Sequence, residues 1–367
     1  MQSYPLQSLK EGSWFKLICG ASYQHLPAVR SLALAYSLAG ADCIDVAADP
    51  AVISAAQEGI KAASQQLRFK GLSGGQPWLM VSINDGVDPH FRKAKFDAAQ
   101  CPSDCPQPCV QVCPAAAIDL SLGGIIESLC YGCGRCEPIC PQDLISNHSY
   151  VSNLEQVIPL VDALGIDAIE IHTQVGHDED FKRVWREISP LAKKLKLLAI
   201  SCTDAPNIIE YLRSLYELIS PLPCPLIWQT DGRSMSGDIG KGTTHAAINL
   251  AQKVLQAELP GYIQLAGGTN DYTVSKLKQA KLLGRPDGAA MSKLSGLAYG
   301  SYARAILSPT IALLETALQP VQVKSISDQP MNQLNLKLED HTELLEQAVA
   351  TAQALVKQIK TASVAHP

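Results

Sequence analysis

Eight of the twelve cysteines in this chain of 367 residues lie between Cys101 and Cys140. Cysteines crowded in this way in a large cytosolic chain are expected to bind metal, because the reducing pool of the cytosol keeps thiols free of disulfides. The segment has two similar halves, CPSDCPQPCVQVCP and CYGCGRCEPICP, and in each half the fourth cysteine is followed by proline. The repeat therefore predicts two related metal centres.

The second half has the x2, x2, x3 spacing of bacterial-type ferredoxins, in which three close cysteines bind one [4Fe-4S] cluster and the fourth binds the other cluster. The predicted ligands of one cluster are Cys113, Cys130, Cys133 and Cys136. Those of the other are Cys101, Cys105, Cys109 and Cys140. A structural zinc site is the alternative, but zinc sites seldom repeat a fourth cysteine followed by proline.

The first half departs from the ferredoxin pattern, because its spacing is x3, x3, x3. Cys101 is therefore the ligand that fits the pattern least well. If Cys101 lies far from its iron, we expect that cluster to convert to a [3Fe-4S] form on oxidation. In the second half, Gly132 and Gly134 are expected to let backbone amides approach the sulfides.

Outside the cysteine segment, apolar runs typical of buried parallel strands alternate with stretches of helical periodicity. The expected strands are 15–20, 42–48, 78–84, 167–173, 197–202, 225–231, 262–268 and 293–300. Eight such units predict an α/β fold with a (β/α)8 TIM-like barrel, and an open doubly wound sheet is the alternative. An amphipathic helix at 340–360 is expected to pack on the exterior of the barrel.

The cysteine segment follows the third expected strand. We predict a first part of the barrel at 1–85, a ferredoxin-like 2[4Fe-4S] insertion at 86–150, the remainder of the barrel at 151–320, and a C-terminal helix and tail at 321–367. In such a barrel, each loop from a strand to the next helix opens on the C-terminal face, where active sites are built. The clusters are therefore expected above the barrel mouth.

Glycines after the seventh and eighth strands could expose backbone amides to a phosphate, such as that of FMN. The candidate cradle is Gly267, Gly268, Gly300 and Ser301. The alternative is that these glycines only permit tight turns. Lys241, in the glycine-rich stretch 231–245, could also bind an anion, or the stretch could act as a lid.

Polar side chains at other strand ends are expected to converge on the mouth, where they could bind a small ligand or serve in acid-base chemistry. They are Asn84, Asp85, Glu170, His172, Thr203, Asp204, Asp231 and Arg233. His172 is more simply interpreted as paired with a neighbour than as catalytic. No nucleophile with an adjacent base is recognisable, so catalytic residues are not assigned. The remaining cysteines are expected to be small buried hydrophobes: Cys19, Cys43, Cys202 and Cys224.

The composition argues against several classes of protein. The formal net charge is −5 and no basic cluster interrupts the sequence, so no nucleic-acid partner is expected. No apolar stretch reaches the roughly 18 to 20 residues that span a bilayer, so no transmembrane segment is expected. The amino terminus lacks the basic start and apolar run of an export signal, and we expect a cytoplasmic protein.

Several stretches together resemble the cyanobacterial light-dependent period (LdpA) family. They are the opening FKLICGASYQHLPAVRSLALAYSLAGADCIDVAADPAV, the paired cysteine runs, IEIHTQVG, IQLAGGTN and GLAYGSYAR, and the likeness extends from about 14 to 318. The resemblance implies an iron-sulfur protein that passes cellular redox state, and so light intensity, to the circadian clock. The partners that it implies are the clock's input kinase and oscillator proteins. Composition and spacing alone show no clock role.

Two functions from different classes follow. A redox sensor would exchange electrons with cellular carriers or the quinone pool, and the altered clusters would change the surface offered to a partner. An oxidoreductase would pass electrons from the clusters to a flavin or a small substrate in the barrel mouth. The resemblance favours the sensor, and the position of the insertion favours the enzyme. We expect a sensor or electron-transfer protein rather than a catalyst.

Overall fold

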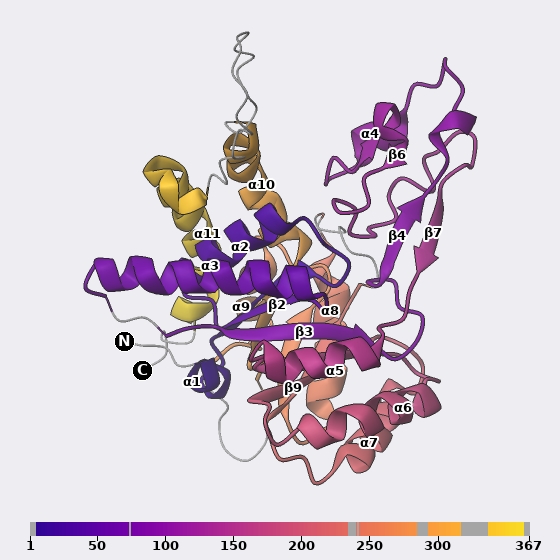
Figure 1. Ribbon diagram of the computed structural model, residues 1–367. Helices are drawn as coiled ribbons and strands as arrows, with labels where there is room; N and C mark the ends of the chain where they lie inside the picture. The colour runs from indigo at the N-terminus through magenta and orange to yellow at the C-terminus, as the bar shows by residue number, and fades with distance from the viewer. Residues whose placement is uncertain are drawn as a thin grey trace.

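The computed structural model describes residues 5–72, 75–233, 240, 242–284, 293–316 and 337–362. Within these ranges, eight parallel strands close into a barrel in the order β1-β12-β11-β10-β9-β8-β3-β2 (Figure 1). The strands are β1 (Trp14–Gly20), β2 (Cys43–Ala47), β3 (Trp78–Asn84), β8 (Ala168–Thr173), β9 (Leu197–Thr203), β10 (Leu226–Asp231), β11 (Tyr262–Ala266) and β12 (Gly296–Tyr299). The predicted (β/α)8 barrel is confirmed, and the open sheet is excluded because β1 pairs with both β2 and β12.

In the same ranges, a helix follows each barrel strand. These helices are α2 (Leu26–Ala39), α3 (Pro50–Phe69), α5 (Leu154–Ala163), α6 (Asp178–Ile188), α7 (Ile208–Ile219), α8 (Thr244–Gln256), α9 (Thr273–Gln279) and α10 (Ser301–Thr316). A further helix, α11 (Thr342–Ala362), packs on the exterior against α2 and α10, as the sequence predicts. None of the helices in the described part of the chain has both the length and the apolar character that a membrane crossing requires.

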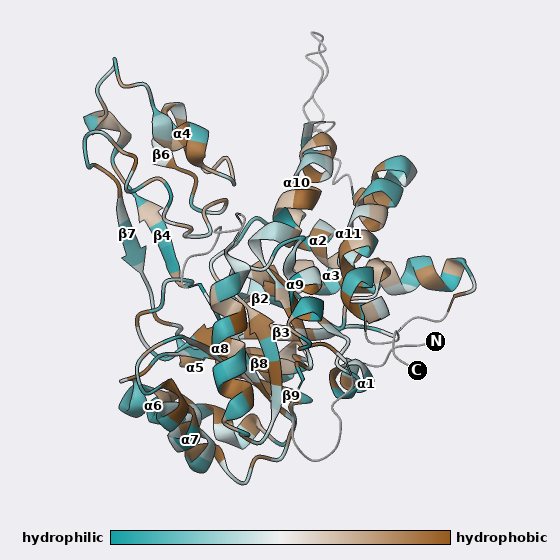
Figure 2. Ribbon diagram, turned by 180° about the vertical axis from the view of Figure 1, so that it is seen from behind, coloured by the Kyte–Doolittle hydropathy of each residue, from teal (hydrophilic) through white to brown (hydrophobic). Residues whose placement is uncertain are grey.

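The apolar side chains of the strands form two layers, because successive residues of a strand face opposite sides of the sheet. Outward-facing residues such as Leu17 and Ile44 pack beneath the helices. Figure 2 shows this arrangement as hydrophobic strands at the centre and hydrophilic residues on the outer surfaces of the helices. Inside the barrel, Trp14, Met80 and Ile227 pack against Leu9 of the short helix α1 (Pro5–Lys10) and close one end.

Helices α2 and α3 approach closely at Gly59. A Cβ atom at Gly59 would lie 2.3 Å from the carbonyl oxygen of Arg30 and 2.9 Å from the Cβ of Ala33. In an open helix, glycine to alanine stabilises by up to about 1 kcal/mol. Here we expect Gly59→Ala to lower the free energy of unfolding by about 1–3 kcal/mol, because the neighbouring backbone must move.

Urea denaturation of the two proteins measures this difference. The control is Ser54→Ala, at an exposed position of the same helix, which should change stability by no more than about 0.5 kcal/mol. A Gly59→Ala variant as stable as the wild type would contradict the close contact between α2 and α3.

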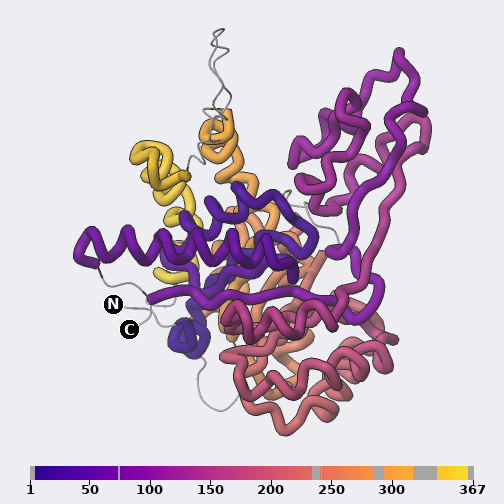
Figure 3. The backbone as a smooth tube through the Cα atoms, in the orientation of Figure 1, coloured from indigo at the N-terminus to yellow at the C-terminus, as the bar shows by residue number. Residues whose placement is uncertain are grey.

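Between β3 and α5 the chain leaves the barrel and forms an arm, which stands away from the barrel in Figure 3. Its stem is an antiparallel pair of strands, β4 (Arg92–Lys95) and β7 (Ser146–Ser149). Beyond the stem lie the helix α4 (Pro108–Val112) and a small hairpin of β5 (Ile118–Asp119) and β6 (Gly124–Ile125). The arm carries all eight cysteines of the repeated segment.

Hydrogen bonds tie the base of the arm to the barrel. The side-chain amide of Asn84, at the end of β3, donates to the carbonyl oxygens of Gly86 and Tyr150 at 2.7 and 2.8 Å. The hydroxyl of Tyr150 in turn donates to the carbonyl oxygen of Ala21, in the loop after β1, at 2.9 Å. These bonds hold the start and the end of the arm beside the barrel mouth.

Candidate iron-sulfur centres and the barrel-mouth site

The cysteines of the arm form two groups. Those of the first group, the proximal set, line one cavity of about 350 Å³, open solvent at its edge included; they are Cys113, Cys130, Cys133 and Cys136. The backbone N–H of Ala94 donates to Cys130 Sγ at 3.4 Å, and that of Ala117 donates to Cys113 Sγ at 3.2 Å. Four thiols around one largely apolar cavity, with amide donors to sulfur, fit the requirements of an iron-sulfur cluster.

The second group, the distal set, is Cys101, Cys105, Cys109 and Cys140. Desolvation and the proximity of the other three thiols raise the pKa of Cys101. The thiol of Cys140 lies against backbone amides, and Leu144 N–H donates to its Sγ at 3.4 Å. Although desolvation opposes them, the amides of residues 142–145 lower the pKa of Cys140. The proximal thiols share one cavity, and the grouping of the distal thiols and the binding of clusters by either set stay predictions.

Gly132 has a structural role as well as the predicted one. Its φ is +68°, and a Cβ atom would lie 2.1 Å from the carbonyl oxygen of Arg92 in β4. The Nε of Arg92 donates to the carbonyl oxygen of Gly132 at 3.0 Å. Close packing of this turn on the stem therefore requires glycine whether or not an amide approaches a sulfide.

Inside the barrel, a layer of buried polar side chains lies beyond the apolar one. Its members are Lys16, Asp45, Ser82, Glu170, Ser201, Gln229 and Gln264. Lys16 Nζ forms ion pairs with Glu170 and with Asp45, the latter at 3.5 Å from Oδ2. Gln229 Nε2 donates to Glu170 Oε1 at 2.7 Å. Buried charges are costly unless they are paired, so this layer marks the mouth as a candidate functional site.

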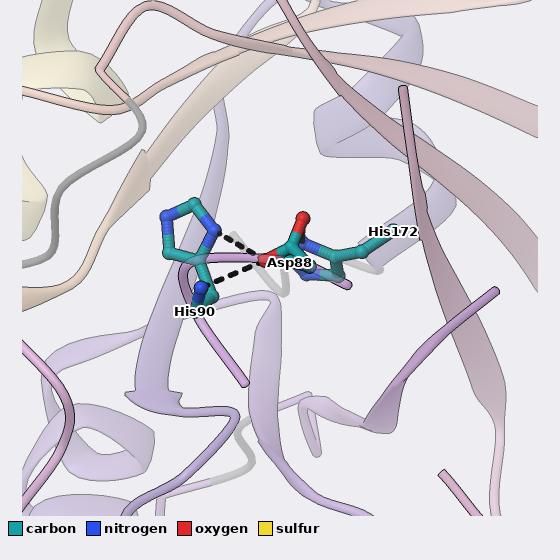
Figure 4. Close-up of side chains that lie close together, drawn as sticks. All are labelled: Asp88, His90 and His172. Atoms are coloured by element: carbon teal, nitrogen blue, oxygen red, sulfur yellow. Dashed lines mark hydrogen bonds and ion pairs between the residues drawn. The ribbon is translucent and has the colours of Figure 1, made fainter. Parts of the chain in front are cut away.

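Two histidines, His90 and His172, lie next to this layer, and Figure 4 shows them on either side of Asp88. His172 Nε2 is 3.0 Å from Glu170 Oε1, and its Nδ1 is 3.8 Å from Asp88 Oδ2. His90 Nδ1 is 3.0 Å from Asp88 Oδ1, and its Nε2 is 3.3 Å from Asp231 Oδ2. The pairing that the sequence favours for His172 is therefore confirmed, and both histidines belong to one buried network.

The network shifts the pKa values of its members. Burial lowers the pKa of His172, but hydrogen bonds to Asp88 and Glu170 outweigh burial and raise it to about 10. Burial likewise opposes ionisation of Asp88, yet the adjacent histidines hold its pKa well below the ordinary value. Burial raises the pKa of Asp45 to about 6 and also raises that of Asp231. Perturbation of this kind is typical of functional sites.

A pocket at the mouth is lined by all four residues of the predicted phosphate cradle, Gly267, Gly268, Gly300 and Ser301. Gly267 and Gly268 have positive φ angles, and their Cβ atoms would lie 1.8 Å from Asp231 Oδ1 and 2.8 Å from the carbonyl oxygen of Thr243. Tight packing therefore accounts for these two glycines without a ligand. Gly300 leaves 3.7 Å to its nearest neighbours and adjoins Ser301 at the start of α10, so this pair is the better candidate for an anion.

Tyr131 connects the arm with this pocket. It follows Cys130 in the chain and lines both the proximal cavity and the mouth pocket. The guanidinium carbon of Arg304 lies 4.3 Å from the centre of the Tyr131 ring. Nη1 of Arg304 donates to the carbonyl oxygens of Ile18 and Cys19, both at 3.0 Å, and so anchors the contact to β1. One aromatic side chain thus separates the proximal set from the barrel mouth.

The structure brings together half of the strand-end residues that the sequence predicts at the mouth. The pocket is lined by Glu170, His172, Asp231 and Arg233. The other four do not line this pocket in the described part of the chain: Asn84, Asp85, Thr203 and Asp204. Asn84 holds the arm, Asp85 pairs with His177 at 2.8 Å, and Asp204 pairs with Lys253 on the surface. The side chains of Asn84, Asp85 and Asp204 are therefore engaged with partners other than the pocket.

Sequence reasoning missed Lys16, Asp45, Asp88 and His90. A signal was present, because Lys16 and Asp45 interrupt the apolar strands FKLICG and CIDVAA, where a charge is costly. Asp88 and His90 stand two residues apart in the loop after β3, as Glu170 and His172 do within β8. Lys241, the other predicted anion ligand, lies outside the described residues.

The barrel and the arm with its two sets of thiols define the class of protein: a β/α barrel that carries an iron-sulfur domain. Residues 101–151 match the LdpA Fe-S cluster-binding domain, and residues 160–358 match the light dependent period A C-terminal domain. The chain is 49% identical over 361 residues to Light dependent period A of Synechococcus elongatus, covering 98% of this chain and 95% of that protein. It belongs to the light dependent period A family.

Among solved structures, N-acetylneuraminate lyase from Mycoplasma synoviae aligns with 95% of this chain and 83% of its own, with 9% identity and a TM-score of 0.37. Octameric ribulose-1,5-bisphosphate carboxylase/oxygenase from Pyrococcus horikoshii aligns with 97% of this chain and 67% of its own, with 8% identity and a TM-score of 0.40. At these sequence identities and TM-scores, the likeness supports no conclusion about the function of this chain.

Proposed function

We propose that this protein is an iron-sulfur redox sensor that relays cellular redox state, and with it light intensity, to the circadian clock. The observation that carries the proposal is the gathering of eight thiols into two sets on an arm beside the barrel mouth. The name of the Synechococcus elongatus relative, Light dependent period A, supports a place in the light-input pathway of the clock.

Each set of thiols is proposed to hold one [4Fe-4S] cluster, with the distal one converting to [3Fe-4S] on oxidation. When bound, such a cluster supplies one-electron transfer. The backbone amides of Ala94 and Ala117 donate to sulfur atoms of the proximal set, and hydrogen bonds of this kind tune a reduction potential. In the distal set, Cys101 and Cys140 are partly exposed, so oxidants can reach them.

The surface of the arm is the proposed contact region for partners. It exposes large apolar side chains of Val110, Leu122 and Ile139, which are 37%, 72% and 41% accessible. The proposed partners are the input kinase and the oscillator proteins of the clock, in the cytoplasm. The proposed electron sources are cellular carriers or the quinone pool.

Chemical analysis tests the cofactor content. Protein purified without oxygen is expected to contain about eight iron atoms and eight acid-labile sulfides per chain, because two cubane clusters each hold four of each. On exposure to air, the iron content is expected to fall to about seven, with a [3Fe-4S] signal in electron paramagnetic resonance. Zinc in place of iron would contradict the proposal, whereas eight irons after air exposure would contradict only the conversion.

An iron-sulfur oxidoreductase is the second candidate, and the observation that favours it is the position of Tyr131 between the proximal cavity and the mouth pocket. In this case FMN or another phosphorylated ligand would meet Gly300 and Ser301. The absorbance spectrum of the same sample separates the two functions. A flavin spectrum, or turnover of nicotinamide or artificial donors, would favour the enzyme, and clusters alone without turnover would favour the sensor.

A further inference from the structure

We propose that Asp88, His90 and His172 bind one divalent transition-metal ion in the barrel mouth, separate from the iron-sulfur clusters. One ligand atom from each of these residues lies within 4.8 Å of the other two (Figure 4). Two imidazoles and a carboxylate are a donor set that suits zinc, iron(II) and manganese(II). The proposal goes beyond redox sensing, because these donors include no cysteine of the arm.

The three donors are held by the fold. His172 belongs to the buried strand β8, and Asp88 and His90 lie in the loop between β3 and β4. The backbone N–H of His90 donates to Asp88 Oδ1 at 2.7 Å. The ring of Phe91 packs against the edge of His172, with centroids 5.1 Å apart. The donor atoms are therefore placed before any ion arrives.

Each imidazole contacts a second carboxylate in addition to that of Asp88. His172 turns Nδ1 toward Asp88 and Nε2 toward Glu170, and His90 turns Nδ1 toward Asp88 and Nε2 toward Asp231. Histidines that bind metal usually donate the N–H of the other ring nitrogen to a carboxylate, which fixes the ring and strengthens the ligand. Both histidines have this arrangement, which a chance pair of surface histidines would lack.

The charge around the donors also favours a cation. Among the described residues, four carboxylates, Asp45, Asp88, Glu170 and Asp231, pair with the two histidines or with Lys16, and the guanidinium groups of Arg233 and Arg304 also line the pocket, so the carboxylates outnumber the permanent cations by one. A divalent ion between neutral imidazoles would offset part of this negative charge. Protonated histidines could do the same without a metal, so a binding experiment must separate the two arrangements.

The test uses the full-length protein with its clusters in place, kept free of oxygen and dialysed against micromolar Zn²⁺ or Mn²⁺. Mass spectrometry of the elements is expected to find about one bound ion per chain in addition to the cluster iron. His90→Ala and His172→Ala should each weaken binding at least tenfold. Asp231→Asn, which removes only a carboxylate behind His90, should weaken it about tenfold. Manganese is included because thiolates prefer softer ions, so cysteines will not account for its binding.

The matched control is His148→Ala, in β7 of the arm, which should bind the ion like the wild type. Circular dichroism and cluster absorbance verify that each variant is folded, and Asp231→Asn keeps the shape of the side chain if a histidine variant fails to fold. The proposal is wrong if the wild type binds neither ion, or if folded His90→Ala and His172→Ala bind as tightly as the wild type. Either result would identify Asp88, His90 and His172 as a network of ion pairs between protonated histidines and carboxylates. Loss of the iron-sulfur clusters alone would instead bear on the proposed function.

Discussion

Cys133→Ser is expected to lose about four iron atoms per chain and to abolish the redox response of the proximal cluster. Cys133 lines the proximal cavity with the other three thiols of its set, and a cubane cluster needs four ligands. A serine hydroxyl does not ionise as a thiol does, so it cannot replace the thiolate. Iron analysis and a redox titration followed by absorbance measure the two losses. In cells, the clock period is expected to stop following light intensity.

The control for this variant is Cys224→Ser. Cys224 is half-buried on the barrel and belongs to neither set of thiols, so the full iron content and the redox response should remain. A Cys133→Ser variant that keeps eight irons would show that Cys133 is not a ligand. A clock period that still tracks light in a variant that has lost the cluster would argue against the sensor.

Lys16→Met is expected to lower the free energy of unfolding by about 3–5 kcal/mol, because it leaves buried carboxylates without their partner. The side chain of Lys16 is fully buried and pairs with Glu170 and Asp45. Desolvation opposes the charge of Lys16, but these two carboxylates outweigh it and raise the pKa of the lysine. Denaturation by urea, with the clusters present and oxygen excluded, measures the loss.

A second variant separates the loss of the ion pair from the loss of packing. The double variant Lys16→Met, Glu170→Gln replaces one of the two carboxylates with a neutral amide. A substantial part of the lost stability should therefore return. Lys182→Met is the control, because Lys182 pairs with Glu179 on an exposed helix face and such pairs contribute at most about 1 kcal/mol. If Lys16→Met costs no more than Lys182→Met, the buried layer does not depend on the ion pair.

The barrel could be predicted from the sequence because parallel strands covered on both sides are apolar along most of their length. The eight apolar runs correspond to the eight strands, and their ends differ by only a few residues, as for 293–300 and β12 (Gly296–Tyr299). The proximal cavity brings together Cys130, Cys133 and Cys136, whose spacing is local, with Cys113 from the other half of the repeat. The division of all eight thiols into two cluster-binding sets stays a prediction from the ferredoxin spacing.

The mouth could be predicted only in part. Asp231 is the last residue of β10 and Asp204 directly follows β9, yet Asp231 lines the pocket and Asp204 pairs with Lys253 on the surface. The direction of a side chain at a strand end depends on the loop that follows, which the pattern of residue types does not specify. Strand ends therefore predict where a site lies better than which residues form it.

The sequence by itself determined the alternation of strands and helices and the insertion of the cysteine segment after the third strand. Each of these follows from periodicity or from short-range spacing. Only the tertiary structure decided that Lys16, Glu170 and Asp45 meet inside the barrel, and that Tyr131 lies between the proximal thiols and the mouth. These contacts join residues far apart in the chain, and barrel closure and the path of the arm bring them together.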